Sequence, residues 1–538
     1  MIVMISVHSP SRSSIDALRP DSATAARAAP TRDPDVKASP AMLSGAELMR
    51  EMGGAPKPNV TLFGRVLHQN SVHYGGALAH LETYQALAKQ VEGQAHGSLS
   101  DKQLRDMKDQ LAAVLVRCDA YVTQHEGDPD KAGRVGTMRN LASMATAELE
   151  ALNRLGQLRN AGGKGLTHED AMAIVRAGVR DAADFNPGLN DAAVDPARSR
   201  DGFASGKVNS VSLLVYGDDT RIVKPLACGS KNLTLGEGFS GFDKSDMKYG
   251  ARNFATERMA ERLGIGDTIP RSNLVIHHGQ AGLAMRLAGG QSLVRHDRVV
   301  ETDPGSIARY DNDLARGHLD NLKRCKAEKN DDGQWTVPKT RFVALPYTDP
   351  EGSHPALTAS LQKGLLDLQT LDCLMAQMDR QPENLFIRLD GDTAHVTGID
   401  NDMCMGKDMT RLGAPGDLAA TAGGPPPLMS REMHDRIANL SEDDFATTLG
   451  PDFSDAEVAA AKTRLTLLKA HAETLRTSGC VVDDFATWRS SEGQSASEFL
   501  MASDTLSYVK RDQTTIDKAT KNGNVVQPDR SKHNLASE

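Results

Sequence analysis

The sequence has few cysteines and few aromatic residues, and both shortages exclude classes of protein. It contains 538 residues, of which six are cysteine and 4% are aromatic. The cysteines lie far apart, without a Cys-x-x-Cys pair or a His/Cys cluster: Cys118, Cys228, Cys325, Cys373, Cys404 and Cys480. We therefore expect neither a disulfide framework nor a structural zinc site.

Long apolar runs and an excess of basic residues are also missing. No stretch approaches the roughly 20 apolar residues of a membrane-spanning helix. The apolar start, residues 1–7, is too short for a secretory signal and has no basic residue before it. The net charge is -9, from 62 basic and 71 acidic residues, which argues against nucleic acid as a partner. A soluble protein of a reducing compartment, with three or four parts, is expected.

The first 58 residues are rich in Ser, Ala, Arg and Pro, and no aromatic residue precedes Phe63. Such a segment buries too little apolar surface to offset the entropy of ordering, so disorder is expected. One interpretation is a plain leader or linker. The other is an export signal of the type III kind, which it resembles in composition and which would bring a secretion chaperone as a partner.

Residues 59–195 show the spacing of a small helical bundle. Apolar residues step by three and four from Leu104 to Val122, which places them on one helix face. Ser100 with Gln103 has the pattern of a capping box, and Thr167 with Asp170 marks a further helix start. The region has no paired carboxylates and no nucleophile with a base, so it offers packing, partner binding or regulation rather than chemistry.

Strand signals begin near Gly202, and one of the strands contains a lysine. Residues 208–216 read as extended, a turn follows, and residues 221–225 form the returning strand. Lys224 lies inside this apolar strand, so it either binds an anion or lies on an edge strand and points to solvent. The next helix, residues 251–264, carries Glu257 and, one turn later, Glu261.

The most specific pattern lies further along the chain. An apolar helix face from Leu361 to Met378 runs into a loop that holds Asp379 and Asn384, because Pro382 prevents the helix from continuing. A short hairpin then leads to Asp400. Two carboxylates and an amide in this order are typical of phosphoryl transfer, with one carboxylate orienting the acceptor and the others holding Mg²⁺. Asp402 is interpreted as solvated rather than as a second ligand.

Residues 200–430 resemble the atypical, phosphoinositide 3/4-kinase-like branch of the protein kinase-like fold. Type II phosphoinositide 4-kinases carry an Asp-Arg-x-x-x-Asn loop and an Ile-Asp-Asn segment, as at 379–384 and 399–401 here. The resemblance implies ATP and Mg²⁺ as cofactors. It implies these roles: Lys224 on the nucleotide phosphates, Glu257 pairing with Lys224, Met285 to Gly289 at the adenine, Asp379 orienting the acceptor, and Asn384 and Asp400 on Mg²⁺.

The chain departs from this family in three places. Gln381 stands where many relatives have histidine, and no Gly-rich phosphate loop precedes Lys224. Glu261 competes with Glu257 as the partner of Lys224, and the sequence does not choose between them.

The expected fold is α+β, with a small antiparallel sheet lobe and a helical lobe. The expected parts are a disordered leader at 1–58, a helical region at 59–195, an N-lobe with an insertion at 196–345, a C-lobe at 346–502 and a polar tail at 503–538. We expect a bacterial effector that is secreted into a host cell and phosphorylates a host protein.

Four other functions stay open. The segment from Met403 to Met429, at the activation-loop position, lacks the basic cluster that an anionic headgroup requires, which favours a protein over a membrane lipid as acceptor. A phosphoinositide kinase is nevertheless an alternative. Kinase-like folds also carry out nucleotidyl transfer and glutamylation, and a catalytically inactive scaffold would use the fold only for binding.

Overall fold

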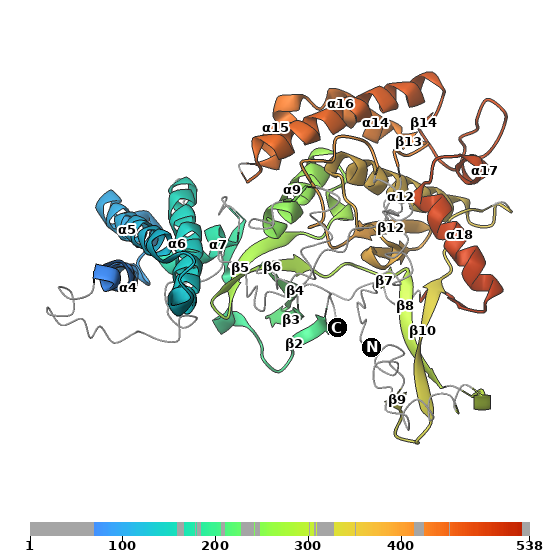
Figure 1. The fold of residues 1–538 in the computed structure, drawn as a ribbon. Coiled ribbons are helices and arrows are strands. Elements are labelled where there is room, and N and C mark those ends of the chain that lie inside the picture. Colours follow the sequence, from blue (N-terminus) through green and yellow to red (C-terminus); the bar gives the residue numbers. More distant parts are fainter. Residues whose placement is uncertain are drawn as a thin grey trace, which may run out of the picture.

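The computed structural model contains an upright helical bundle, a twisted sheet and a helical lobe (Figure 1). It describes residues 69–158, 166–177, 179, 184–205, 210–226, 241–242, 248–300, 302–305, 308, 328–349, 351–413, 424–450 and 452–529. The predicted leader at 1–58 lies outside the described residues. Within them, no helix is both long enough and apolar enough to cross a bilayer.

The predicted helical bundle is present. It consists of α4 (Gln69–Val91), α5 (Asp101–His125), α6 (Ala132–Leu158) and α7 (His168–Arg176). Both predicted capping boxes form, from Ser100 to Gln103 and from Thr167 to Asp170. The apolar stripe of α5 is buried, as its spacing predicts, with Leu111 fully covered.

A six-stranded sheet follows, in the order β1-β5-β6-β4-β3-β2. Its strands are β1 (Phe185–Asn190), β2 (Arg200–Ser205), β3 (Ser210–Tyr216), β4 (Asp219–Pro225), β5 (Ser272–His277) and β6 (Gln280–Arg286). All neighbours are antiparallel except β1 and β5. The helical region was predicted to end at residue 195. Because β1 belongs to the sheet, the region ends before residue 185.

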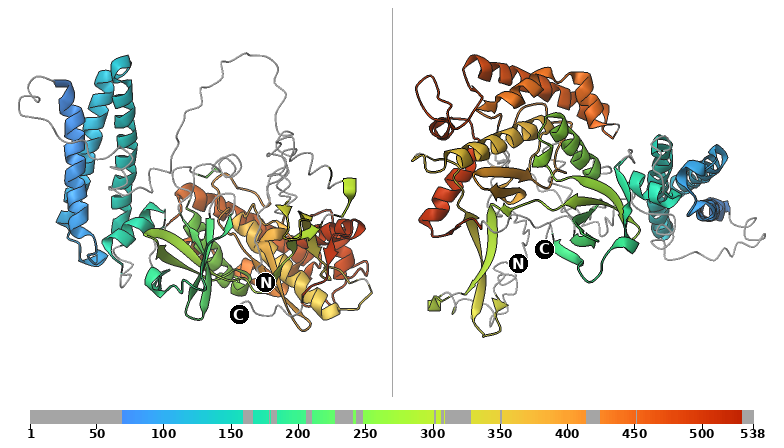
Figure 2. Two further views of the ribbon diagram at one scale, coloured as in Figure 1. Left: turned by 90° about the horizontal axis from the view of Figure 1, so that it is seen from below. Right: turned by 180° about the vertical axis from the view of Figure 1, so that it is seen from behind.

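The bundle and the sheet share one apolar core. Leu226, Phe254, Leu274 and Leu283 of the sheet side pack in the same cluster as the buried faces of the bundle helices. Figure 2 shows the bundle standing at the side of the sheet that is away from the helical lobe. The bundle is therefore packed on the sheet and is not a separately tethered unit.

The helical lobe is built around one buried helix, α12 (Pro355–Met375), whose apolar residues from Leu361 to Met375 are covered. A small sheet of β12 (Thr393–Gly398), β11 (Leu385–Asp390) and β7 (Gln291–Ser292) lies beside it. The surrounding elements are α9 (Tyr249–Arg262), β13 (Met429–Ser430), α14 (Arg431–Asn439), α15 (Glu442–Leu449), α16 (Asp455–Thr477), β14 (Val481–Val482) and α17 (Ala496–Ala502).

The boundary between the lobes lies earlier than predicted. A long hairpin of β8 (Val294–Val300) and β10 (Trp335–Val343), with the short β9 (Glu328–Lys329), extends from the molecule. Its inner residues Leu293, Val343 and Leu345 belong to the core of the helical lobe. The chain therefore passes from one lobe to the other at residues 287–290, not at 345–346.

The predicted polar tail is wrong for residues 503–529. Helix α18 (Tyr508–Lys521) packs on α12, and β15 (Val525–Val526) adds a parallel strand to β10. Tyr508 and Val509 are fully buried, and the charges of Arg511 and Asp512 are buried as a pair.

The expected α+β fold with a sheet lobe and a helical lobe is confirmed.

Candidate active site

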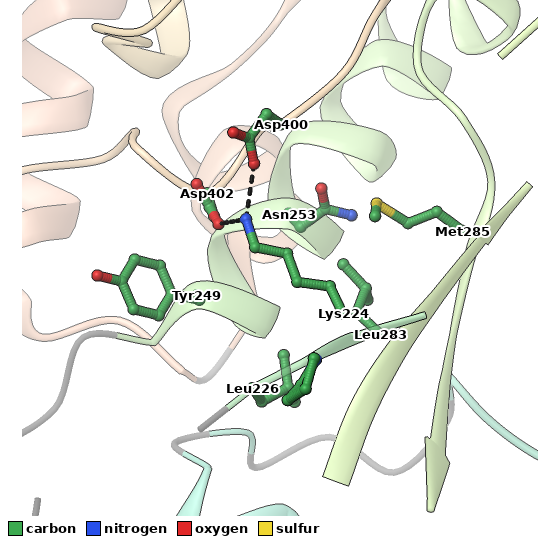
Figure 3. A pocket seen from close by; sticks show the side chains of 9 residues that line it. Lys224, Leu226, Tyr249, Asn253, Leu283, Met285, Asp400 and Asp402 are labelled. Atoms are coloured by element: carbon green, nitrogen blue, oxygen red, sulfur yellow. Dashed lines mark hydrogen bonds and ion pairs between the residues drawn. The ribbon is translucent and has the colours of Figure 1, made fainter. Parts of the chain in front are cut away.

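A lysine and two aspartates meet where the six-stranded sheet faces the helical lobe. Lys224 lies on β4, and Asp400 and Asp402 lie in the turn after β12. The Lys224 Nζ donates to Asp400 Oδ1 at 2.6 Å and also pairs with Asp402 (Figure 3). Lys224 and Asp400 are 176 positions apart in the chain, so the cluster joins the two lobes.

Lys224 is not on an edge strand. Strand β4 lies between β3 and β6, and the Lys224 side chain is only 17% exposed. A lysine in this position needs an anion, because a buried ammonium without a partner is costly. Burial by itself would lower the pKa of Lys224, but Asp400 and Asp402 raise it, so the ammonium stays charged at neutral pH.

Asp402 is a partner of Lys224 rather than a solvated residue, which corrects the interpretation from sequence. It is 7% exposed, and burial together with the neighbouring Asp400 raises its pKa. Burial acts on Asp400 in the same sense, but Lys224 and then Arg380 lower the pKa of Asp400. Two carboxylates share one ammonium, and this excess of negative charge suits an additional cation.

The loop that carries Asp379 and Asn384 lies beside Asp400. The short helix η8 (Pro382–Asn384) ends the loop, and the Asn384 Nδ2 donates to the Asp379 carbonyl at 2.7 Å. The Ile399 backbone N–H donates to the Asn384 carbonyl at 3.0 Å. Asp400 itself has a φ of 60°, the left-handed region that aspartate tolerates better than most residues.

These residues fit a magnesium ion. Asn384 is fully buried, its amide nitrogen is used by the Asp379 carbonyl, and its Oδ1 is a buried acceptor without a hydrogen-bond partner. A buried amide oxygen of this kind normally has a partner. Carboxylate and amide oxygens are the hard ligands that Mg²⁺ prefers. Asn384 Oδ1 and the Asp400 carboxylate are therefore the atoms that would hold the metal.

Arg380 connects the loop that carries Asp379 and Asn384 with the turn that carries Asp400. Its fully buried guanidinium forms two hydrogen bonds with Asp372, at 2.9 and 3.1 Å. It also donates to the Ile399 carbonyl and to the Asn401 side chain. A Cβ at Gly398 would come within 2.7 Å of this guanidinium, so the position requires glycine. Arg380 therefore links the loop that carries Asp379 to the residues on both sides of Asp400.

The predicted pair of Lys224 with Glu257 is not what the structure contains. Glu257 accepts a hydrogen bond from the Ser272 backbone N–H at 2.9 Å, at the start of β5. Glu261 pairs with Arg271 at 2.8 Å. Both glutamates of α9 thus face the β5 start, and Asp400 and Asp402 take the place at Lys224 that the resemblance assigned to Glu257.

Glu257→Gln is expected to stabilise the fold above pH 7. Burial raises the pKa of Glu257 to about 7 from an ordinary 4.5. Its unfolded form ionises first as pH rises, so wild-type stability falls between pH 4.5 and 7 and then levels off. Glutamine keeps an acceptor for Ser272. Unfolding at pH 8 should require about 2 kcal/mol more, which is below the full linkage value of about 3.4 kcal/mol because Glu257 is partly exposed to solvent. The measurement is the unfolding midpoint from pH 5 to 8.

The same variant separates two roles of Glu257. If Glu257 only anchors β5, the phosphotransfer rate of Glu257→Gln should lie within a few fold of the wild-type rate. Glu261→Gln, at an exposed ion pair on the same helix, is the matched control and should change neither quantity. Loss of phosphotransfer in Glu257→Gln but not in Glu261→Gln would instead support the predicted pairing of Glu257 with Lys224.

Two other predicted residues have different fates. Met285 on β6 lines a small pocket together with Lys224 and Asp400 (Figure 3). Gly289 is not part of that lining, since it lies in the crossing between the lobes, where a Cβ would come within 3.2 Å of Arg388. The next residue, Gly290, has a φ of 85° and no room for a Cβ beside the Ile387 backbone.

The sequence did not identify two residues of helix α9 that line this pocket. Tyr249 and Asn253 lie at its wall, and Asn253 donates to the Ser272 hydroxyl at 3.0 Å. Asn253 is one helical turn before Glu257 and shares its face. An asparagine among the apolar contacts of a helix is the signal that would have found it, since a buried amide requires partners.

Comparisons with known proteins give a weak structural likeness and no match of sequence. No family model matches the sequence, and no curated protein matches it. Among solved structures, the chain is similar to the Helicobacter pylori proinflammatory kinase CtkA, with a TM-score of 0.27 and 11% identity. The match covers 53% of this chain and 98% of that one. At this score the likeness supports no functional argument, so the function has to be inferred from the site.

Proposed function

We propose that the chain is an ATP-dependent phosphotransferase, with Lys224 on the nucleotide phosphates and Asn384 and Asp400 on Mg²⁺. The observation that carries this proposal is the cluster of Lys224, Asp400 and Asp402 beside the unpartnered Asn384 Oδ1. A cation that can bind phosphate and oxygens that can bind Mg²⁺ lie together between two lobes, which is the arrangement that phosphoryl transfer uses.

Each residue would have a distinct task. Lys224 would exchange a carboxylate for phosphate oxygens, while Met285, Leu283 and Leu226 line the apolar part of the pocket. Asp379 would orient the acceptor hydroxyl and take its proton. When bound, Mg²⁺ would neutralise the charge that develops on the phosphates.

A protein is the preferred acceptor. In the described part of the segment after Asp402, the exposed Lys407 and Arg411 are accompanied by Asp408, so the charge stays near balance. A phosphoinositide headgroup carries several negative charges and requires a basic surface. Residues 414–423 of this segment lie outside the described residues, and the lipid is kept as an arm of the test.

The test is transfer of ³²P from labelled ATP with Mg²⁺ to three acceptors: the protein itself, eukaryotic cell lysate and phosphoinositide vesicles. Wild type should label protein, and Lys224→Met should abolish labelling and weaken ATP binding. Labelling of vesicles alone would favour the lipid kinase. If ATP–Mg²⁺ neither binds nor is consumed, with lysate present to supply an activator, the binding scaffold is the correct alternative.

We further propose that residues 1–58 act as an export leader that delivers the enzyme to a host cell, with a secretion chaperone bound there. The support is composition alone: no aromatic residue, frequent Ser and Ala, and five prolines among the first 40 residues, at Pro10, Pro20, Pro30, Pro34 and Pro40. A fusion of residues 1–58 to a reporter should reach the host cytosol through a type III apparatus. Retention of that fusion in the bacterium would remove the effector assignment but not the phosphotransferase.

A further inference from the structure

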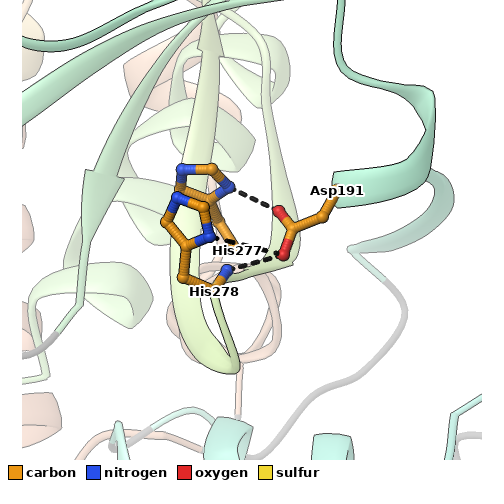
Figure 4. Close-up of side chains that lie close together, drawn as sticks. All are labelled: Asp191, His277 and His278. Atoms are coloured by element: carbon orange, nitrogen blue, oxygen red, sulfur yellow. Dashed lines mark hydrogen bonds and ion pairs between the residues drawn. The ribbon is translucent and has the colours of Figure 1, made fainter. Parts of the chain in front are cut away.

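Two adjacent histidines and Asp191 gather at the turn of the β5–β6 hairpin (Figure 4), and Asp201 lies near both imidazoles. None of these residues lines the Lys224 pocket. His277 ends β5, and His278 begins the turn. Asp191 comes from the short helix η5 (Asp191–Ala193), and Asp201 comes from β2. Side chains from three separate segments of the chain thus meet at one point of the sheet.

Asp191 orients His277. The His277 Nδ1 lies 2.5 Å from Asp191 Oδ1, and the His278 backbone N–H donates to Asp191 Oδ2 at 2.8 Å. When the Nδ1–H donates to the carboxylate, the lone pair of a neutral imidazole is on Nε2. The His277 Nε2 is buried and has no hydrogen-bond partner. A carboxylate that holds one ring nitrogen while the other ligates is the usual arrangement at metal-binding histidines.

Asp201 faces the other side of both rings. Its oxygens lie 3.7 Å from the His277 Nε2 and 3.8 Å from the His278 Nε2. These distances are too long for hydrogen bonds. They are close to the separation of two ligand atoms on one tetrahedral zinc ion, about 3.4 Å for bonds of about 2.1 Å. Small side-chain rotations would close the difference.

The backbone of the turn holds the two imidazoles together. His278 has a φ of 50° and Gly279 has a φ of 72°, so both central residues are left-handed, a turn for which Asn-Gly is the favoured sequence. The result places the His277 and His278 rings 3.9 Å apart with an interplanar angle of 35°. Both Nε2 atoms thereby point toward Asp201.

We propose that Asp201, His277 and His278 bind a divalent transition-metal ion, zinc being the best match, and that Asp191 positions His277. Imidazole with carboxylate suits zinc, whereas Mg²⁺ and Ca²⁺ take oxygen ligands. In the described part of the chain, Asp191 and Asp201 pair with His277 and His278 and with no lysine or arginine. With neutral imidazoles, the two negative charges are therefore not balanced by a protein cation.

The ion would link β2 to the β5–β6 hairpin. Helix η5 would be held to that hairpin by the contacts of Asp191 with His277 and His278. Three protein ligands leave one position for water. The expectation from sequence that no zinc site exists rested on cysteine spacing. These four residues are spread from 191 to 278 and show no motif, so only folding brings them together.

The experiment uses the full-length protein after chelation, in excess Mg²⁺ so that the oxygen site at Asp400 and Asn384 is saturated. Co²⁺ is titrated first, and its visible absorption reports nitrogen and oxygen ligands. Zn²⁺ then displaces it. We expect one tight equivalent, weakened at least 10-fold in His278→Asn and in Asp201→Asn, and 10- to 100-fold in Asp191→Asn.

The variants are chosen to preserve the fold. Asparagine tolerates the left-handed backbone of position 278, and the Asp201 side chain is 68% exposed. His395→Asn, at an exposed histidine on β12, is the matched control and should bind the ion as wild type does. Equal Co²⁺ affinity in wild type and both ligand variants, or no binding to wild type, would leave an ordinary histidine–aspartate cluster and overturn the proposal. Neither result depends on phosphotransfer.

Discussion

Asp379→Asn should lower phosphoryl transfer by about 1,000-fold while ATP binding stays within a few fold of wild type. A positioned general base contributes about 10²–10⁴-fold, and an amide cannot accept the proton of the acceptor hydroxyl. The loop should keep its shape, because Asn384 donates to the backbone carbonyl of residue 379 and not to its side chain. Initial transfer rates and ATP affinity, measured separately, distinguish the two effects.

Asp400→Ala should fail in a different way from Asp379→Asn. It removes a proposed Mg²⁺ ligand and one of the two carboxylates on Lys224, so both nucleotide binding and transfer should be lost. Asp392→Ala, the same exchange at an exposed turn of the β11–β12 hairpin, is the control and should behave as wild type. If Asp379→Asn retains more than a tenth of the activity, another carboxylate orients the acceptor, and Asp402 is the first to examine.

Features that depend on neighbouring residues could be predicted from the sequence. The capping boxes at Ser100 and Thr167 both form, because the signal requires only one residue and a second residue three positions later. The strand that carries Lys224 and the break at Pro382 follow from equally local rules. The approach of Lys224 to Asp400 followed from the resemblance rather than from local spacing.

The partner of Lys224 depended on how helix α9 is rotated against the sheet. All residues from Tyr249 to Thr256 are buried, including the polar Arg252 and Asn253, so in this half of α9 the pattern of polar residues does not predict which face is exposed. Arg252 decides it in the structure: its guanidinium binds the Cys404 and Met405 carbonyls and Glu457 of α16. Although burial opposes it, Arg252 and Lys248 lower the pKa of Glu457 to about 2.

The composition of the C-terminal end predicts a solvated tail where the fold has a buried helix, for a related reason. Residues 508–521 contain several charged and polar side chains and therefore look like a solvated tail. In the fold, the Arg511 guanidinium pairs with Asp512 and donates to the Arg380 carbonyl at 2.6 Å, and the Tyr508 hydroxyl donates to Asp372 at 2.8 Å. Charged and polar groups that pair with one another can be buried, and the number of such residues in a sequence does not reveal these pairs.

Arg380→Met should cost about 3–5 kcal/mol of stability, the range for breaking a buried ion pair by removing one partner. The Asp372 carboxylate would lose its bonds to Arg380 and keep the bond from the Tyr508 hydroxyl of α18. The Ile399 carbonyl would lose the hydrogen bond that Arg380 donates. Trp488 packs against the core of the helical lobe, whereas Trp335 lies on β10 of the long hairpin. Denaturant unfolding followed by the fluorescence of Trp488, with Trp335 replaced by phenylalanine, therefore reports on this lobe.

Two further variants show whether the charge or the packing of Arg380 matters. Arg380→Lys keeps the charge but not the two-pronged contact with Asp372, so we expect an intermediate loss. Adding Asp372→Asn to Arg380→Met removes the stranded charge and should recover more than half of the stability. Transfer should stay low in that double variant, because the bonds from Arg380 to the Ile399 carbonyl and the Asn401 side chain, which join the loop of Asp379 to that of Asp400, are then missing. A stable double variant with wild-type activity would show that Arg380 serves the fold alone.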